Sequence, residues 1–181
     1  MTERIALFPL RTVLFPRAVL PLRIFETRYL DLVRRSLREQ AGFGIVLIRA
    51  GAEVGEVSAM APVGTYGRIE DFDSLPDGLL RIVVRGERRF RIREHGLQDD
   101  GLHLGDVDWL EDPPGASLAA AEFVELRGIL EAVLREVGND YPAGPPAFDD
   151  ALWVSSQLAQ LLPAPAGYRQ QLLELDEARE R

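Results

Sequence analysis

Two histidines and one group of carboxylates are the residues of this 181-residue chain best suited to acid–base or metal chemistry. His95 and His103 are separated by a Gly- and Asp-rich stretch, and we expect both to be exposed beside a hairpin loop. Glu70, Asp71, Asp73 and Asp77 surround Phe72, but Leu75 and Pro76 interrupt the alternate spacing that a calcium loop needs. We therefore predict a solvated turn and no metal.

The chain contains neither cysteine nor lysine, so all 21 basic residues are arginines. This composition excludes disulfides, thiolate nucleophiles, Schiff-base lysines, Ser–Lys dyads and the lysine of a phosphate-binding loop. The segment 113–117, PPGAS, superficially resembles the opening of such a loop, but no Gly-Lys-Ser/Thr follows, and we interpret it as a linker. We predict no catalytic residue, no cofactor and no enzyme; a deep polar cleft with convergent carboxylates would reopen that class.

A basic stripe is the basis for one binding hypothesis. Arg85, Arg89, Arg91 and Arg93 lie around Phe90, and in a strand the last three would share one face. Such a face could bind RNA. The formal net charge of −8 disfavours nucleic acid and anionic membranes as main partners, so RNA binding is the alternative hypothesis.

Aromatic residues are the basis for the preferred hypothesis. Phe8, Phe15, Phe25, Tyr66 and Phe72 outnumber what a small core needs, and a contiguous exposed patch would bind polypeptide. We predict that this contact surface consists of Phe15, Val19, Phe25, Tyr66 and Phe72.

The elements that must position these residues begin with short extended segments over Ile5–Leu22. Pro9, Pro16 and Pro21 interrupt them, as is tolerated at strand edges and bulges. A helix is expected over Thr27–Gln40, with Gly42 as its terminator. Strands are then expected over Phe43–Arg49, Val63–Phe72, Leu79–Arg85, Arg88–Glu94 and Leu102–Trp109, with a turn at 76–78 and a hairpin connection at Gly86 and Glu87.

The apolar period becomes helical after residue 112. Ser117 should cap a helix that ends near Val137, and its buried side should carry Phe123, Leu126, Leu130, Val133 and Val137. A second helix should run from Asp149 or Asp150 to Pro163, with Leu152, Leu158, Leu161 and Leu162 in the core, and a third over Tyr168–Arg179. No segment has the roughly 18 apolar residues of a membrane helix, and the start lacks a secretion signal, so we expect a cytoplasmic protein.

The chain resembles the substrate-binding (N-terminal) domain family of the ATP-dependent Lon protease. The resemblance is carried by LFPL at 7–10, VLFP at 13–16, LPL at 20–22, Phe25-Glu26, Arg28-Tyr29, VGT at 63–65, LPDG at 75–78, the strand 86–92, LLP at 161–163 and QQLLELDE at 170–177. Arg17 departs from the pattern, where glycine is expected.

The resemblance implies an α+β fold: a PUA-like antiparallel pseudo-β-barrel with an inserted helix over 1–112, then a C-terminal helical subdomain over 113–181. It further implies a free-standing, non-catalytic module that binds unfolded or tagged polypeptides and can form a homodimer. It carries over no catalytic residue, and the chain lacks the lysines of the family's ATPase and protease parts.

Overall fold

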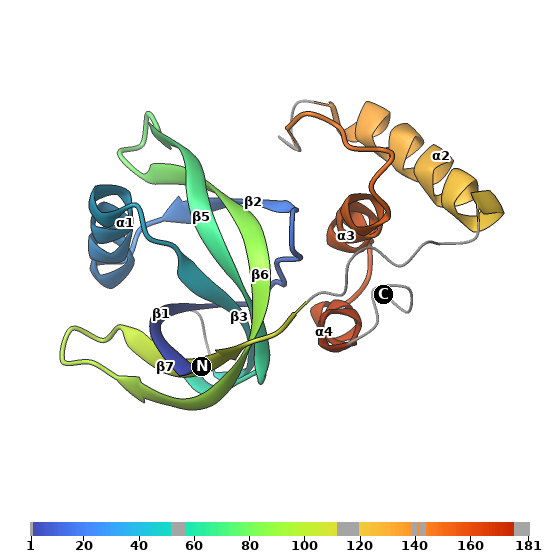
Figure 1. The fold of residues 1–181 in the computed structure, drawn as a ribbon. Helices are drawn as coiled ribbons and strands as arrows, with labels where there is room; N and C mark the ends of the chain where they lie inside the picture. The colour runs from blue at the N-terminus through green and yellow to red at the C-terminus, as the bar shows by residue number, and fades with distance from the viewer. Residues whose placement is uncertain (1, 52–56, 112–119, 139–140, 142–143, 176–181) are drawn as a thin grey trace.

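The computed structural model describes residues 2–51, 57–111, 120–138, 141 and 144–175. These residues form a mixed α+β fold, in which a mostly antiparallel sheet is combined with four helices, and this confirms the predicted class. One helix lies on one side of the curled sheet, and the three C-terminal helices lie on the other (Figure 1). The predicted boundary at 112/113 falls outside the described residues.

The strands close into a ring. They are β1 (Thr2–Leu10), β2 (Val19–Ile24), β3 (Phe43–Gly51), β4 (Val57–Met60), β5 (Val63–Ser74), β6 (Leu80–Leu97) and β7 (His103–Trp109). The hydrogen-bonded order β1-β7-β6-β5-β3 returns to β1 through a parallel β1–β3 pairing. The long strand β6 pairs with β2 along its first half and with β7 along its second half, on the same edge.

The predicted hairpin connection at Gly86 and Glu87 is wrong, because β6 runs unbroken through both residues. The Gly86 amide donates to Ala18 O at 2.9 Å, and Gly86 O accepts from the Arg17 amide at 2.7 Å. A Cβ at position 86 would overlap the carbonyl oxygen of Phe15. The glycine marks a close crossing of two backbones, not a turn.

The helix α1 (Thr27–Glu39) matches the predicted span to within one residue, but its terminator does not. Gln40 adopts the left-handed conformation that ends the helix, with φ 51°. Gly42 is needed for space instead, since a Cβ there would overlap Gly67 O.

The remaining helices are α2 (Ala120–Val137), α3 (Ala151–Leu161) and α4 (Ala166–Glu174). The predicted cap Ser117 and the part of the third predicted helix beyond residue 175 lie outside the described residues. Asp150 caps α3, because its Oδ1 accepts from the Leu152 and Trp153 amides at 3.0 and 3.2 Å. Leu162 is a wrong core prediction: it follows the end of α3 and its side chain is exposed. Among the described residues, no helix is long and apolar enough to cross a membrane.

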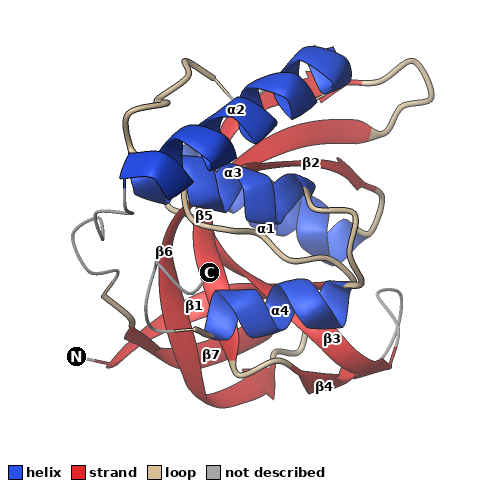
Figure 2. Ribbon diagram, turned by 90° about the vertical axis from the view of Figure 1, so that its right-hand side faces the viewer, coloured by secondary structure: helices blue, strands red, loops and turns tan. Residues whose placement is uncertain are grey.

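The main core is shared between the barrel and the helices. Phe15, Phe43 and Val84 from the barrel side form one buried cluster with Ala159 of α3 and Leu173 of α4. Figure 2 shows α3 and α4 lying across the sheet. A separate cluster around Leu130 and Trp153 joins α2 to α3.

Three buried glutamines join these helices to barrel backbone, and we call Gln157, Gln160 and Gln170 the glutamine joint. Gln160 accepts from the Phe15 amide at 3.0 Å and donates to Val13 O at 3.1 Å. Gln170 donates to Val63 O at 2.9 Å. Because these bonds satisfy buried backbone groups, the joint fixes how the helices dock.

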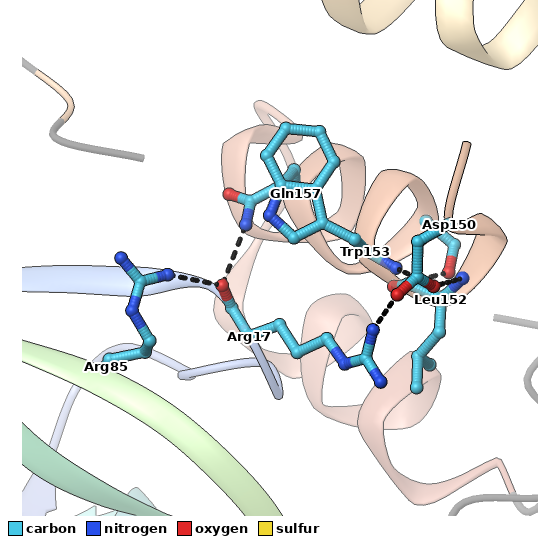
Figure 3. A network of polar contacts seen from close by, with 7 residues as sticks. Arg17, Arg85, Asp150, Leu152, Trp153 and Gln157 are labelled. Carbon is cyan, nitrogen blue, oxygen red and sulfur yellow. Dashed lines mark hydrogen bonds and ion pairs between the residues drawn. The ribbon is translucent and has the colours of Figure 1, made fainter. Parts of the chain in front are cut away.

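Arg17 connects the same surfaces (Figure 3). Its φ of 62° is the left-handed conformation for which glycine is the usual choice, as the family pattern expects. The Arg17 carbonyl accepts from Gln157 Nε2 at 2.9 Å and from Arg85 Nη1 at 3.0 Å. Its guanidinium bonds Asp150, the cap of α3. The side chain thus adds a contact to α3 that a glycine would lack.

Candidate functional site

Two phenylalanines are exposed near one end of β2 and β5. Phe25, between β2 and α1, and Phe72, near the end of β5, are each 57% exposed. Large aromatic side chains usually dominate buried cores, so two half-exposed rings on a small domain favour a contact surface.

A pocket of about 230 Å³ opens beside Phe25. Its walls are Phe8, Pro9, Leu10, Leu22, Ile24 and Tyr29; Thr12, Arg23, Phe25 and Glu26 complete the lining. The rings of Phe8 and Tyr29 stack at a centroid distance of 3.9 Å. The pocket is therefore mostly apolar, with a rigid aromatic pair in its wall.

Two charged residues line this pocket: Glu26 has an ion-pair partner, and Arg23 has none among the described contacts. Glu26 Oε2 pairs with Arg28 Nη2 at 2.8 Å. Arg23 is exposed and makes no ion pair or hydrogen bond among the described contacts. In the β2–β6 register Arg23 projects from the face of the sheet opposite to Leu22 and Ile24, so its charge points away from the apolar wall of the pocket.

The sheet register relates Phe72 to this pocket. Phe72 lies opposite Ile82 of β6, and Ile82 lies opposite Leu22 of β2. Directly opposed residues project from the same face of a sheet, so Phe72 and the pocket residue Leu22 flank the buried Ile82 on one face.

Three residues of the predicted contact surface are placed elsewhere. Phe15 is only 1% exposed and Val19 is fully buried, because both belong to the segment on which the helices dock. Tyr66 is half-buried: its hydroxyl accepts from the Gly42 amide at 2.6 Å, and its ring meets Trp109 edge-on. Of the five predicted residues, Phe25 and Phe72 offer exposed rings.

The predicted basic stripe does not form one exposed face. Arg89 is 1% exposed and donates to Leu173 O and Leu175 O, both at 2.8 Å. Its guanidinium therefore satisfies backbone carbonyls at the C-terminal end of α4 from inside the core. Arg85 bonds Glu70 and Arg93 bonds Asp108. Arg91 is half-buried. Because Arg89 is buried and both Arg85 and Arg93 are paired with carboxylates, the four guanidinium groups do not form one free basic surface.

Two carboxylates of the predicted acidic cluster, Asp71 and Asp77, bond to groups within the β5–β6 hairpin. Asp71 pairs with Arg81 at 3.2 Å, and Asp77 accepts from the Leu79 amide at 3.1 Å in the predicted turn, where Gly78 has φ 80°. The described residues contain no group of three or more His, Cys, Asp or Glu that could hold a metal ion.

The two histidines flank the β6–β7 hairpin as predicted, but only one is exposed. His103 is buried, with its ring 6.2 Å from that of His95. Burial, followed by the charges of His95 and Arg28, lowers the pKa of His103 from its ordinary value. The neutral imidazole is therefore the form that the fold favours.

The glutamine joint was missed from the sequence. Gln157 and Gln160 lie four and seven residues after the buried Trp153, on one stripe of α3. Polar residues in phase with an apolar stripe were the available signal. The Tyr141 hydroxyl extends the joint by donating to Gln157 Oε1 at 2.6 Å, and burial raises the pKa of Tyr141 to about 12.

Comparisons with known proteins agree in one family. The family model described as the ATP-dependent protease La (LON) substrate-binding domain matches residues 4–181. The chain is 30% identical to Lon protease 2 of Herpetosiphon aurantiacus over 99% of the chain and 23% of that protein. It is 24% identical to Lon protease of Escherichia coli strain K12 over 99% of the chain and 24% of that protein. The chain thus spans about a quarter of these curated relatives.

Solved structures give the same result. The crystal structure of a Lon N-terminal domain protein from Xanthomonas campestris is 40% identical, with a TM-score of 0.76 over 97% of this chain and 92% of that one. The N-terminal domain of a Mycobacterium avium complex Lon protease shares the fold at 18% identity and a TM-score of 0.59, over 98% of this chain and 93% of that one. Because the family model covers nearly every residue, the chain belongs to the Lon substrate-binding domain family.

Proposed function

We propose that this chain is a non-catalytic module that binds unfolded or tagged polypeptides in the cytoplasm. The single observation that carries the proposal is the match to a substrate-binding domain over residues 4–181. The exposed rings of Phe25 and Phe72 and the apolar pocket support it, because polypeptide-binding sites combine exposed apolar surface with shaped pockets. The ring of strands also supports a pseudo-barrel of the PUA-like kind.

The composition supports the non-catalytic part of the proposal. A chain without lysine has neither the lysine of a nucleotide-binding loop nor that of a Ser–Lys protease dyad. The chain spans 22–24% of the Lon proteases of Cytophaga hutchinsonii and Escherichia coli strain K12, so its likeness to those proteins lies in their substrate-binding part.

Binding of a labelled, permanently unfolded polypeptide tests the proposal by fluorescence anisotropy. Phe25→Asp and Phe72→Asp should each weaken binding by about tenfold or more, as is typical of interface aromatic side chains. Val124→Asp is the matched control, because Val124 is exposed on α2. Figure 1 shows α2 on the other side of the sheet from α1, which Phe25 precedes. Wild-type affinity in both phenylalanine variants would refute this surface, and no binding by the wild-type protein would refute the function.

A further inference from the structure

A second pocket lies at the seam of the barrel, and we propose that it binds a carboxylate that is preceded by a peptide group. A free acylated amino acid and the C-terminal end of a polypeptide share this chemistry. The seam pocket has no lining residue in common with the pocket beside Phe25, so the inference does not rest on the proposed function. It depends on the position of the pocket, on an unpaired strand edge and on the charge of Arg35.

The seam pocket lies where the ring of strands opens between β1 and β3. It is lined by residues just before the first β1–β3 pair, Leu7 and Gly44, and by the second half of α1 and the β6–β7 hairpin. Its volume of about 350 Å³ is at the lower end of the usual range for small-molecule sites, about 300–1,000 Å³. A cavity on the order of 150 Å³ holds a benzene ring, so this pocket has room for roughly two such groups.

The wall formed by β1 is an unpaired strand edge. β1 pairs with β7 over Thr2–Leu7, but it pairs with β3 only over Leu7–Leu10. Residues 3–6 therefore have a described strand on one side alone, and all four line the seam pocket. In an antiparallel pair, every second residue turns its N–H and C=O groups away from the neighbouring strand. This edge can thus bond a peptide group of a ligand, as in recognition by strand addition.

Another wall of the seam pocket is one stripe of α1. Arg28, Leu32, Arg35 and Glu39 are spaced four, three and four residues apart, which places them on the same side of the helix. Arg28 Nη1 donates to Gly101 O at 3.0 Å and holds this side against the β6–β7 hairpin. Leu32 is buried, and Arg35, one turn further along, is half-buried in the lining. The stripe therefore places a guanidinium at the pocket.

The carboxylates of the lining do not compensate Arg35. Glu39 pairs with Arg38 at 2.9 Å, and Glu3 accepts from Trp109 Nε1 at 2.9 Å. Arg35 has no ion pair or hydrogen bond among the described residues. Because a guanidinium matches the geometry of a carboxylate with paired N–H donors, a carboxylate is the ligand group that this side chain favours.

The remaining charges around the seam pocket have partners within the fold. Arg4 Nε pairs with Asp106 Oδ1 at 3.3 Å. The C-terminal end of α1 also borders the pocket, and such an end carries negative partial charge. There the carbonyl of the cap residue Gln40 accepts from Arg68 Nη1 at 3.1 Å, which offsets part of this charge. Arg35 is therefore the charge that a ligand can neutralise.

Titrations followed by NMR test the inference with three small probes. N-acetyl-alanine has a carboxylate after a peptide group, N-acetyl-alaninamide lacks the charge, and propionate lacks the peptide group. The wild-type protein should bind N-acetyl-alanine about fivefold or more tightly than either of the other two, the range of a charged hydrogen bond. The backbone amide shifts of residues 3–6 should move during the titration.

Neutralising the arginine gives the decisive variant. Arg35→Gln should reduce the preference for the acid over the amide to a ratio of about one. Arg34→Gln is the matched control on the exposed side of the same helix and should keep the wild-type preference. Gln98→Trp, at an exposed position of the lining, should weaken binding of N-acetyl-alanine by filling the pocket. Circular dichroism verifies the fold of each variant.

A longer peptide that ends in alanine with a free carboxylate identifies the source of the ligand. Tighter binding of this peptide than of N-acetyl-alanine assigns a polypeptide end, whereas equal or weaker binding assigns a small acid, and both results support the site. The inference is overturned if N-acetyl-alanine does not bind, if it binds no more tightly than the amide or propionate, or if Arg35→Gln and Gln98→Trp bind as the wild-type protein does. None of these results changes the outcome expected for Phe25→Asp and Phe72→Asp with an unfolded polypeptide.

Discussion

Arg89 Nη1 lies 2.8 Å from the carbonyl oxygen of Leu173, so a barrel strand caps the last turn of α4 from the inside. A second carbonyl, that of Leu175, accepts from the same nitrogen. The last carbonyls of a helix have no partner within the helix, and buried ones must find one elsewhere. Here the partner is a charged group from another part of the fold.

Removing this group should be costly. Arg89→Ala should lower the free energy of unfolding by about 3 kcal/mol, because two buried carbonyls lose a charged donor. Urea denaturation measures the change. Arg91→Ala, on the same strand and with no hydrogen bond among the described contacts, should stay within about 0.5 kcal/mol. Similar losses in the two variants would contradict the assigned role.

Loss of a glutamine of the joint should also lower the free energy of unfolding, because buried backbone groups would lose their side-chain partners. Gln160→Leu leaves the Phe15 amide and Val13 carbonyl without partners in a buried setting and should cost about 3 kcal/mol. Gln171→Leu changes an exposed residue on α4 and serves as the control. Thermal unfolding by calorimetry compares them; unchanged stability of Gln160→Leu would show that the bonds contribute nothing.

Substitutions at Arg17 compare two contributions to stability: the backbone strain of its left-handed conformation and the ion pair of its side chain with Asp150. Glycine accepts the φ of 62° without penalty and removes about 1 kcal/mol of strain, which offsets the lost exposed ion pair with Asp150. Arg17→Gly should therefore change stability by less than about 0.5 kcal/mol. Arg17→Val, which keeps neither advantage, should be destabilised by about 1–2 kcal/mol. Equal stabilities of the two variants, measured by urea denaturation, would exclude this account.

The backbone crossing at Gly86 makes a steric prediction. Gly86→Ala should lower the free energy of unfolding by more than about 2 kcal/mol, because the new Cβ would overlap Phe15 O and the backbone cannot move easily. Gly96, in the same strand, has open space at its Cβ position. Gly96→Ala should be close to neutral in the same urea titration, and a tolerant position 86 would disprove the crossing.

The lowered pKa of His103 leads us to expect that the stability of the folded protein depends on pH. This pKa is lowered in the folded state, first by burial, so the unfolded chain binds the proton more readily. The stabilisation is therefore fully present above the unfolded pKa of about 6.5 and is lost as pH falls towards the folded pKa. Between pH 7 and 5.5 the wild-type protein should lose stability more steeply than His103→Gln; parallel curves would contradict this.

The sequence predicted those parts of the fold that depend on local pattern. The helix at Thr27–Glu39, the 76–78 turn and the three C-terminal helices follow from apolar spacing and turn residues. Gly86 was misread because a glycine that opens a turn and one that admits a second backbone look alike in one sequence. Gln157, Gln160 and Arg89 were missed or misassigned because polar residues are usually exposed, and only the docked helices explain their burial.

Sequence reasoning also failed to separate the exposed from the buried residues of the predicted contact surface, because their exposure depends on tertiary packing. Exposure of Phe25 and burial of Phe15 depend on which segment the helices cover, and no local pattern encodes that choice. The pocket itself joins residues from β1, β2 and α1, whose proximity is a property of the closed ring.

The glutamine joint also bears on cooperativity. A fragment that stops before residue 112 would retain every strand, yet Val13 O, Val63 O and the Phe15 amide would lose the side chains that satisfy them, and Arg89 would lose its acceptors. Neither half is complete without the other. We therefore expect strands and helices to melt in a single transition, and division of the chain to yield two insoluble pieces.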